Sequence, residues 1–202
     1  MAFSDFKEIP EVQAQFRIRH RRQAFVGGEP LTPSEQFLQE LAFTRQHIDV
    51  LASEAAKCQA LIYPILREVY KAYAEDYVLW IGKSIAYDDI LSGTPDYFVS
   101  TRSELGPRVV GSPLIMLVEA KKNDFEMGWG QCLAELVAAQ KINADADFPV
   151  YGIVTDGDRW QFGRLVNDTF TEEPMSFLLQ DLPALFGAID AVFKAATEAV
   201  VE

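Results

Sequence analysis

The sequence has few cysteines and no long apolar run. Cys58 and Cys132 are its only cysteines, and their spacing fits no metal-binding motif. No apolar run approaches the roughly 18 residues of a transmembrane helix, and the stretch MAFSDFKEIPEV has no basic segment followed by an apolar one. These absences predict a cytoplasmic protein with reduced thiols, no signal peptide and no membrane partner.

Positive charge is also scarce. The 202 residues carry 18 Lys and Arg against 30 Asp and Glu, which gives a net charge of −12. This balance argues against a large basic surface that coats nucleic acid, but it allows a nuclease, whose metal site is itself acidic. Basic residues gather in RIRHRR, from Arg17 to Arg22. That cluster indicates either a solvated edge strand or arm, or a contact with nucleic-acid phosphates.

The length and the hydrophobic fraction of 49% predict a single domain with a substantial core. Thr32 can cap a helix that has Pro33 at its first position, and we expect a break near Ser53 or just before Pro64. The predicted segments are an irregular N-terminal arm (1–32), a helical segment (33–74), a sheet with the active site (76–166) and a C-terminal helix (181–200).

Five stretches have the apolar content and the turn boundaries of β-strands. They are residues 76–86, 95–101, 114–121, 148–155 and 159–166. Asp156-Gly157 is a hairpin signal between the last two, whereas the third stretch reaches the fourth through a predicted helix over residues 131–143. This order predicts an α/β fold with a central mixed β-sheet flanked by α-helices.

The stretch LIMLVEAKKN, Leu114 to Asn123, ends a buried strand in charged residues. Residues two apart on a strand share a face, so Glu119 and Lys121 are expected on one side and Ala120 on the other. Asp96 begins the preceding strand and would approach Glu119 if the two strands pair. Two adjacent carboxylates repel unless a cation neutralises them, and Mg²⁺ suits such oxygen ligands. A plain ion pair of Glu119 with Lys121 is the structural alternative.

These residues resemble the motif of the PD-(D/E)xK nuclease superfamily. Pro95-Asp96 matches the first part of the motif and Glu119-Ala120-Lys121 the second. Three further stretches are similar to the nuclease domain of type I restriction enzyme subunits. They are SEAAKCQALIYPIL, which contains Glu54, WGQCLAEL, which contains Gln131, and VYGIVTDGDRWQF, which follows the predicted site. The resemblance covers roughly residues 50 to 166.

The resemblance implies a restriction-endonuclease-like fold and a Mg²⁺-dependent endonuclease that hydrolyses DNA, in a restriction or defence role, with Mn²⁺ able to substitute. Asp96, Glu119 and the Ala120 carbonyl would hold the metal, and Lys121 would assist the attacking water. Glu54 would bind a second ion or orient a water, and Gln131 would shape the site.

The same resemblance implies a homodimer that cuts both DNA strands. No motor follows the matched region, so a motor or specificity protein would be a separate partner. The alternative function is a catalytically inactive relative that acts as a binding or regulatory module. Beside the site, Lys122 is expected to face outward or toward DNA, and Trp129 either anchors the core or stacks on a base.

Overall fold

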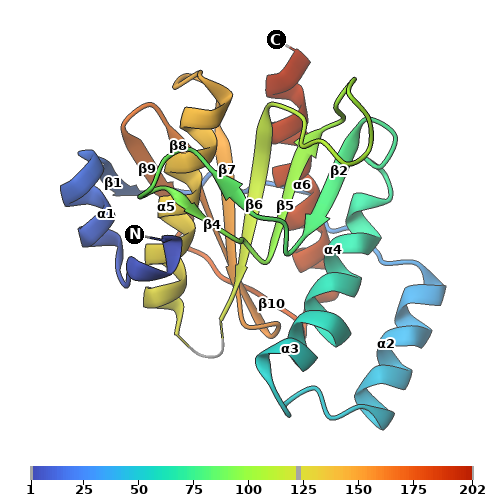
Figure 1. Ribbon diagram of the computed structural model, residues 1–202. Coiled ribbons are helices and arrows are strands. Elements are labelled where there is room, and N and C mark those ends of the chain that lie inside the picture. The colour runs from blue at the N-terminus through green and yellow to red at the C-terminus, as the bar shows by residue number, and fades with distance from the viewer. Residues whose placement is uncertain (1, 122–123, 202) are drawn as a thin grey trace.

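A computed structural model describes residues 2–121 and 124–201 of the chain, so the expectation for Lys122 lies outside the described residues. The described residues form an α/β fold around a mixed, eight-stranded sheet (Figure 1). Its strands are β1 (Arg19–Arg22), β2 (Tyr77–Ile81), β5 (Tyr97–Thr101), β6 (Leu114–Ala120), β7 (Val150–Thr155), β8 (Arg159–Val166), β9 (Thr169–Glu172) and β10 (Phe177–Leu178). A separate pair is β3 (Ile85–Ala86) with β4 (Ser92–Gly93).

The sheet has the order β1-β9-β8-β7-β6-β5-β2, and β10 pairs with β8. The pairs β6–β7 and β1–β9 are parallel, and the other pairs are antiparallel. The predicted mixed central sheet is therefore confirmed. Strands β5 and β6 lie side by side, as the approach of Asp96 to Glu119 requires.

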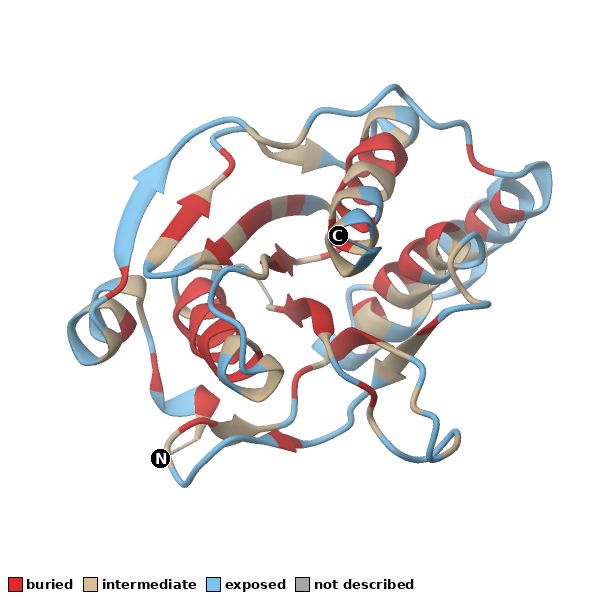
Figure 2. Ribbon diagram, turned by 90° about the horizontal axis from the view of Figure 1, so that it is seen from above, coloured by how far each residue is buried: buried red, intermediate tan, exposed pale blue. Residues whose placement is uncertain are grey.

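The helices cover both faces of the sheet (Figures 1 and 2). They are η1 (Phe3–Asp5), α1 (Ile9–Phe16), α2 (Glu35–His47), α3 (Glu54–Lys57), the π-helical turn η2 (Cys58–Ile62), α4 (Tyr63–Tyr70), α5 (Phe125–Asn143) and α6 (Leu182–Val201). Helix α5 packs on one face of β6 and β7, and α6 packs on the other. Since both faces are covered, every residue of β6 is buried, which explains its nearly continuous apolar sequence.

Helix α5 begins at Phe125, six residues earlier than predicted, with the Asp124 side chain accepting a hydrogen bond from the Met127 amide. Gly128 and Gly130 precede the predicted helix start at Gln131 but lie inside the helix, where other parts of the chain approach them closely. A Cβ atom on Gly128 would lie 2.6 Å from Val154, and one on Gly130 would lie 2.7 Å from the Lys7 backbone. Close packing overrides the low helix propensity of glycine here.

The helical segment breaks before Ser53, as predicted, and the Ser53 side chain caps α3. Thr32 is not the cap of the preceding helix; Ser34 takes this role, accepting a hydrogen bond from the Phe37 amide at 3.2 Å. Near Pro64, the chain does not stop but widens into the turn η2. A π-helical turn before a proline relieves the lost hydrogen bond without ending the helix.

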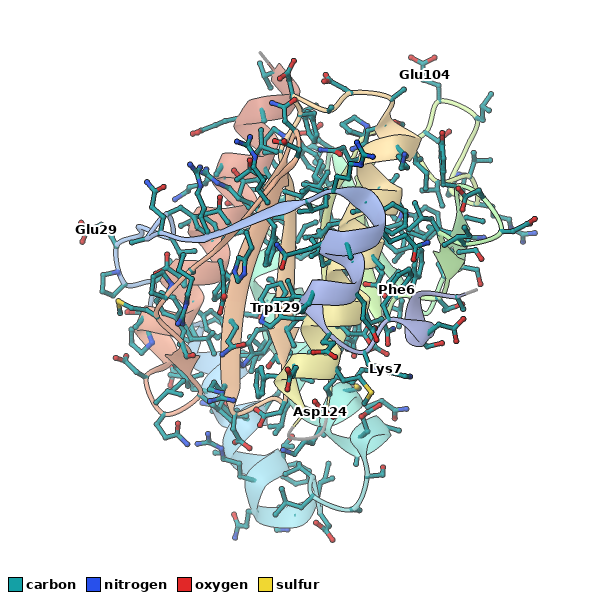
Figure 3. The ribbon with its side chains drawn as sticks, turned by 90° about the vertical axis from the view of Figure 1, so that its left-hand side faces the viewer. Phe6, Lys7, Glu29, Glu104, Asp124 and Trp129 are labelled. Atoms are coloured by element: carbon teal, nitrogen blue, oxygen red, sulfur yellow. The ribbon has the colours of Figure 1, made fainter. Side chains whose placement is uncertain are left out.

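The prediction of an irregular arm over residues 1–32 is wrong for much of its length. The arm contains α1, which packs on α5, and strand β1, which extends the sheet beside β9. Figure 3 shows Phe6 and Lys7 beside α5, whose N-terminal end is marked by Asp124. The basic cluster forms the exposed edge strand β1, and Arg19 there pairs with Asp168 at 2.6 Å.

Among the described residues, no helix combines the length and the apolar composition that crossing a bilayer requires.

Candidate active site

The candidate site lies where β5 begins and β6 ends. The two strands pair in antiparallel register with Tyr97 opposite Val118, so Asp96 stands next to the end of β6. The backbone amide of Ala120 donates a hydrogen bond of 2.8 Å to Oδ2 of Asp96. This bond anchors the Asp96 carboxylate beside Glu119, as the sequence predicts.

Glu119 and Lys121 share one face of β6 and form an ion pair of 2.7 Å between Oε1 and Nζ. The Glu119 side chain is 2% exposed and that of Lys121 is 17% exposed. Ala120 packs on the opposite face with the core cluster that includes α6. The predicted alternation of these three residues is therefore confirmed.

Burial and mutual charge interactions shift the pKa values of the ionisable groups in the site. Burial, followed by the negative charge of Asp96, raises the pKa of Glu119 from 4.5 to about 7, although Lys121 opposes the rise. Burial also raises the pKa of Asp96, against the hydrogen bond from Ala120 and the charge of Lys121. For Lys121, burial acts to lower the pKa, but the Glu119 carboxylate outweighs it and the pKa is raised. The ammonium group of Lys121 thus counters the raised pKa values of both Glu119, which is buried, and Asp96, which is half-buried.

A further acid, Glu135, lies behind Glu119 and was not predicted. It stands on α5, is fully buried, and accepts a hydrogen bond of 3.3 Å from Nε2 of Gln131 at Oε1. Burial and the charge of Glu119 raise the pKa of Glu135 well above its usual value. Glu135 therefore favours its protonated form more than an exposed acid does, and its side chain acts to lower the pKa of Glu119.

The signal for Glu135 was present in the sequence. It is an acid four residues after Gln131 in the helical stretch GQCLAELVAAQ, which is otherwise nearly apolar. Residues four apart share one face of a helix. An acid on a buried helix face needs a partner, and here the partners are Gln131 and Glu119. Gln131 itself is 9% exposed and acts on the site through Glu135.

Glu54 lies at the rim of the site rather than at its centre. It is the first residue of α3, is exposed, and lines a shallow pocket of about 300 Å³ together with Asp96, Cys58 and Gly82. Its negative charge contributes to the raised pKa values of Asp96 and Lys121. The structure therefore brings Glu54 to the same pocket as Asp96.

Trp129 anchors the core, which is one of the two roles predicted for it; the other was stacking on a base. It is 3% exposed, donates a hydrogen bond of 2.8 Å from Nε1 to Gln161, and packs against Phe170 with ring centroids 5.3 Å apart. A side chain enclosed in this way is not presented for stacking on a base.

The carboxylates of Glu119 and Asp96 suit a small, hard cation. Oε2 of Glu119 is buried and has no hydrogen-bond partner among the described residues. Within residues 2–121 and 124–201, no three His, Cys, Asp or Glu side chains stand together as a metal-binding group. The protein would thus supply Asp96, Glu119 and the Ala120 carbonyl, and the remaining ligands would be water or phosphate oxygens, as Mg²⁺ usually has.

No protein-family model matches the chain, and no curated protein matches it either. The geometry of the site and its motifs are therefore the basis for assigning a function.

Proposed function

We propose that the chain is a Mg²⁺-dependent endonuclease of the restriction-endonuclease-like fold that hydrolyses DNA phosphodiester bonds. One observation carries the proposal: Asp96 and the pair Glu119–Lys121 are fixed at the meeting of two strands by bonds of 2.8 and 2.7 Å. The buried acid Glu119 and the half-buried acid Asp96, both with raised pKa values at one strand end, are costly for folding alone, and such perturbed groups cluster at functional sites.

The sheet supports the proposed fold. Antiparallel β5–β6 supplies the acids, and β6 connects to the parallel strand β7 through α5. Helix α5 returns Gln131 and Glu135 to the back of the site. A central mixed sheet with its acids at the strand ends is the arrangement that the motif resemblance implies.

Each residue has a role in the proposed reaction. Asp96, Glu119 and the Ala120 carbonyl would hold Mg²⁺, which neutralises charge on the phosphate and makes an attacking water more acidic. Lys121, at 17% side-chain exposure, can turn from Glu119 toward that water or toward the charge that develops on the phosphate. Glu54 at the rim would orient a further water.

The test is cleavage of supercoiled plasmid, linear duplex and single-stranded DNA with Mg²⁺ or Mn²⁺. Wild-type protein should cut at least one substrate, and Asp96→Asn and Glu119→Gln should each lower the rate by at least about 100-fold. Glu104→Gln, an exposed acid in the loop after β5, is the matched control and should cut like wild type. Wild-type protein that cuts no DNA, in a buffer where a reference nuclease works, would overturn the proposal.

The near-complete burial of Glu119 favours one other function, a catalytically inactive module that binds DNA or a protein. In that case the ion pair with Lys121 is a structural element and needs no cation. DNA binding that survives Asp96→Asn and Glu119→Gln, without cleavage by wild type, would support this second function.

A further inference from the structure

A second pocket lies on the sheet face that α6 covers, away from the candidate active site. It has a volume of about 480 Å³ and lies between α6, the segment of residues 25–31, and the strands β7 and β8. Its walls include the side chains of Phe25, Tyr151, Arg164 and Lys194. It shares none of its lining residues with the pocket that contains Asp96 and Glu54.

The outer wall of the pocket is fixed at both ends. Oε2 of Glu173, which is 3% exposed, accepts hydrogen bonds from the amides of Phe25 at 2.8 Å and Val26 at 2.9 Å. At the other end, the Leu31 amide donates to the carbonyl of Pro183 at 2.9 Å. The wall is thus held in place before any ligand arrives, as small-molecule sites usually are.

Glycine lets this wall approach α6. A Cβ atom on Gly28 would lie 2.5 Å from the carbonyl oxygen of Gly187, a separation that no side chain tolerates. The two glycines therefore set the depth of the pocket.

Arg164 brings a positive charge to the pocket, whose lining also contains the acids Glu29, Asp190 and Glu198. Its guanidinium carbon lies 5.0 Å from the centre of the Phe25 ring, and Arg164 also acts to lower the pKa of Tyr151. Among residues 2–121 and 124–201, no carboxylate lies within 4.0 Å of the guanidinium. Arg164 lines the pocket, and a guanidinium has five N–H donors that can bind an anion.

Asp190, an acid of α6 that lines the pocket, is already paired. Asp190 accepts a hydrogen bond of 2.7 Å from the Tyr73 hydroxyl and pairs with Lys194 at 2.7 Å. Glu198 also lines the pocket but is exposed. Burial is the main cause of the raised pKa of Tyr151, and the charge of Glu198 is a smaller one. A half-buried guanidinium in a preformed pocket is therefore available to an anion from outside the chain.

We propose that this pocket binds a small organic anion, with a phosphate or carboxylate group on Arg164 and a planar ring beside Phe25 and Tyr151. The rings of Phe25 and Tyr151, 6.3 Å between centroids, offer an aromatic surface next to the guanidinium. Lys194 also lines the pocket, where it pairs with Asp190, and the charge of Glu198 in the lining would oppose an anionic ligand. The volume lies in the range of small-molecule sites, which is about 300 to 1,000 Å³.

The test is calorimetric titration with three probes: adenosine monophosphate, adenosine and benzoate. The buffer contains EDTA, so that no divalent cation brings a phosphate to the Asp96 site. Binding of adenosine monophosphate or benzoate, and not of adenosine, is expected, and the pair of probes tells a phosphate site from a carboxylate site. No binding of either anion, or equal binding of adenosine and its monophosphate, would overturn the proposal.

Substitutions test whether the anion binds at Arg164. Arg164→Met should weaken it at least about tenfold, because a charge-assisted bond is lost, whereas the exposed Arg108→Met serves as the matched control and should bind like wild type. If Arg164→Met fails to fold, two surface variants decide. Lys194→Met should weaken binding about threefold and Glu198→Gln should strengthen it about threefold. Unchanged affinity in both would contradict the proposal. Cleavage of DNA is not involved, so the outcome is independent of the proposed nuclease function.

Discussion

The backbone amide of Ala120 donates a hydrogen bond to the carboxylate of Asp96 across the β5–β6 pair, at 2.8 Å. The bond engages Oδ2 and fixes the carboxylate next to the residue that precedes Ala120, which is Glu119. Ala120 is therefore more than a spacer between an acid and a lysine, because its backbone sets the distance between the two acids.

Lys121→Met should separate cleavage from metal binding. Lys121 holds Oε1 of Glu119 at 2.7 Å in the described structure, and a bound cation would take over this neutralising role. The variant should still bind Mn²⁺ at pH 8.5 but lose at least about 100-fold in cleavage rate, because the stabilising ammonium group is gone. Calorimetry and a cleavage assay measure the two effects, and Lys141→Met, at the far end of α5, is the control. Unchanged cleavage by Lys121→Met would contradict its assigned role.

Stability should fall as the pH rises through neutrality. Burial, and then the charge of Asp96, raises the pKa of Glu119 to about 7 from 4.5. Between these values the folded protein keeps a proton that the unfolded chain releases, so the contribution of Glu119 is complete below pH 4.5 and is lost as the pH passes 7. This contribution to the free energy of unfolding is on the order of 3 kcal/mol.

Urea unfolding at pH 5 and pH 8 measures the effect. Glu119→Gln cannot titrate, so its loss of stability between the two pH values should be smaller than that of wild type by about 3 kcal/mol. Glu104→Gln, an exposed acid, should keep the full wild-type loss. Equal pH dependence of wild type and Glu119→Gln would show that Glu119 titrates normally.

Glu135 should tolerate glutamine but not alanine. Burial raises the pKa of its carboxyl well above the usual value, which favours the neutral form, and an amide of the same shape can keep the hydrogen bond with Gln131. Glu135→Gln should stay within about 1 kcal/mol of wild type, whereas Glu135→Ala should cost about 3 kcal/mol through a cavity and unpaired polar groups. Urea unfolding compares the two. A glutamine variant as unstable as the alanine variant would mean that the carboxyl is ionised.

Gly130→Ala should destabilise the fold although alanine is the better helix former. The new Cβ would lie 2.7 Å from the carbonyl carbon of Lys7, where the N-terminal segment crosses α5. We expect a net cost of about 2 kcal/mol, because overpacking against backbone exceeds the helix-propensity gain of about 1 kcal/mol. Gly27→Ala is the control, since no atom lies within 4 Å of its Cβ position and it should be neutral or slightly stabilising. Equal stabilities of the two variants would refute the close approach.

The sequence predicted the elements that depend on local pattern. The apolar run of β6 and the hairpin at Asp156-Gly157 were found because burial and turn chemistry mark them directly. The placement of Glu119 and Lys121 on one face followed from strand periodicity, and the approach of Asp96 needed only the pairing of β5 with β6.

Other features depend on contacts between distant residues and have no local signature. Strand β1 exists because β9, about 150 residues later, supplies its hydrogen-bonding partner. The start of α5 was misplaced because Gly128 and Gly130 are required by packing against Lys121, Val154 and the Lys7 backbone. Glu135 is a partial exception: the sequence marks it as an acid in a nearly apolar helix, but only the packing of α5 on β6 shows that it faces Glu119.

Calorimetric titration of Mn²⁺ at pH 8 into wild type, Asp96→Ala and Glu119→Ala tests the central claim most directly. This pH lies above the raised pKa of Glu119, so the carboxylate is free of its proton. The account predicts binding to wild type that each substitution weakens at least about tenfold, with Glu104→Ala as an unaffected control. Binding that survives both substitutions, or wild-type protein that binds no Mn²⁺ even with DNA present, would contradict a metal site at Asp96 and Glu119.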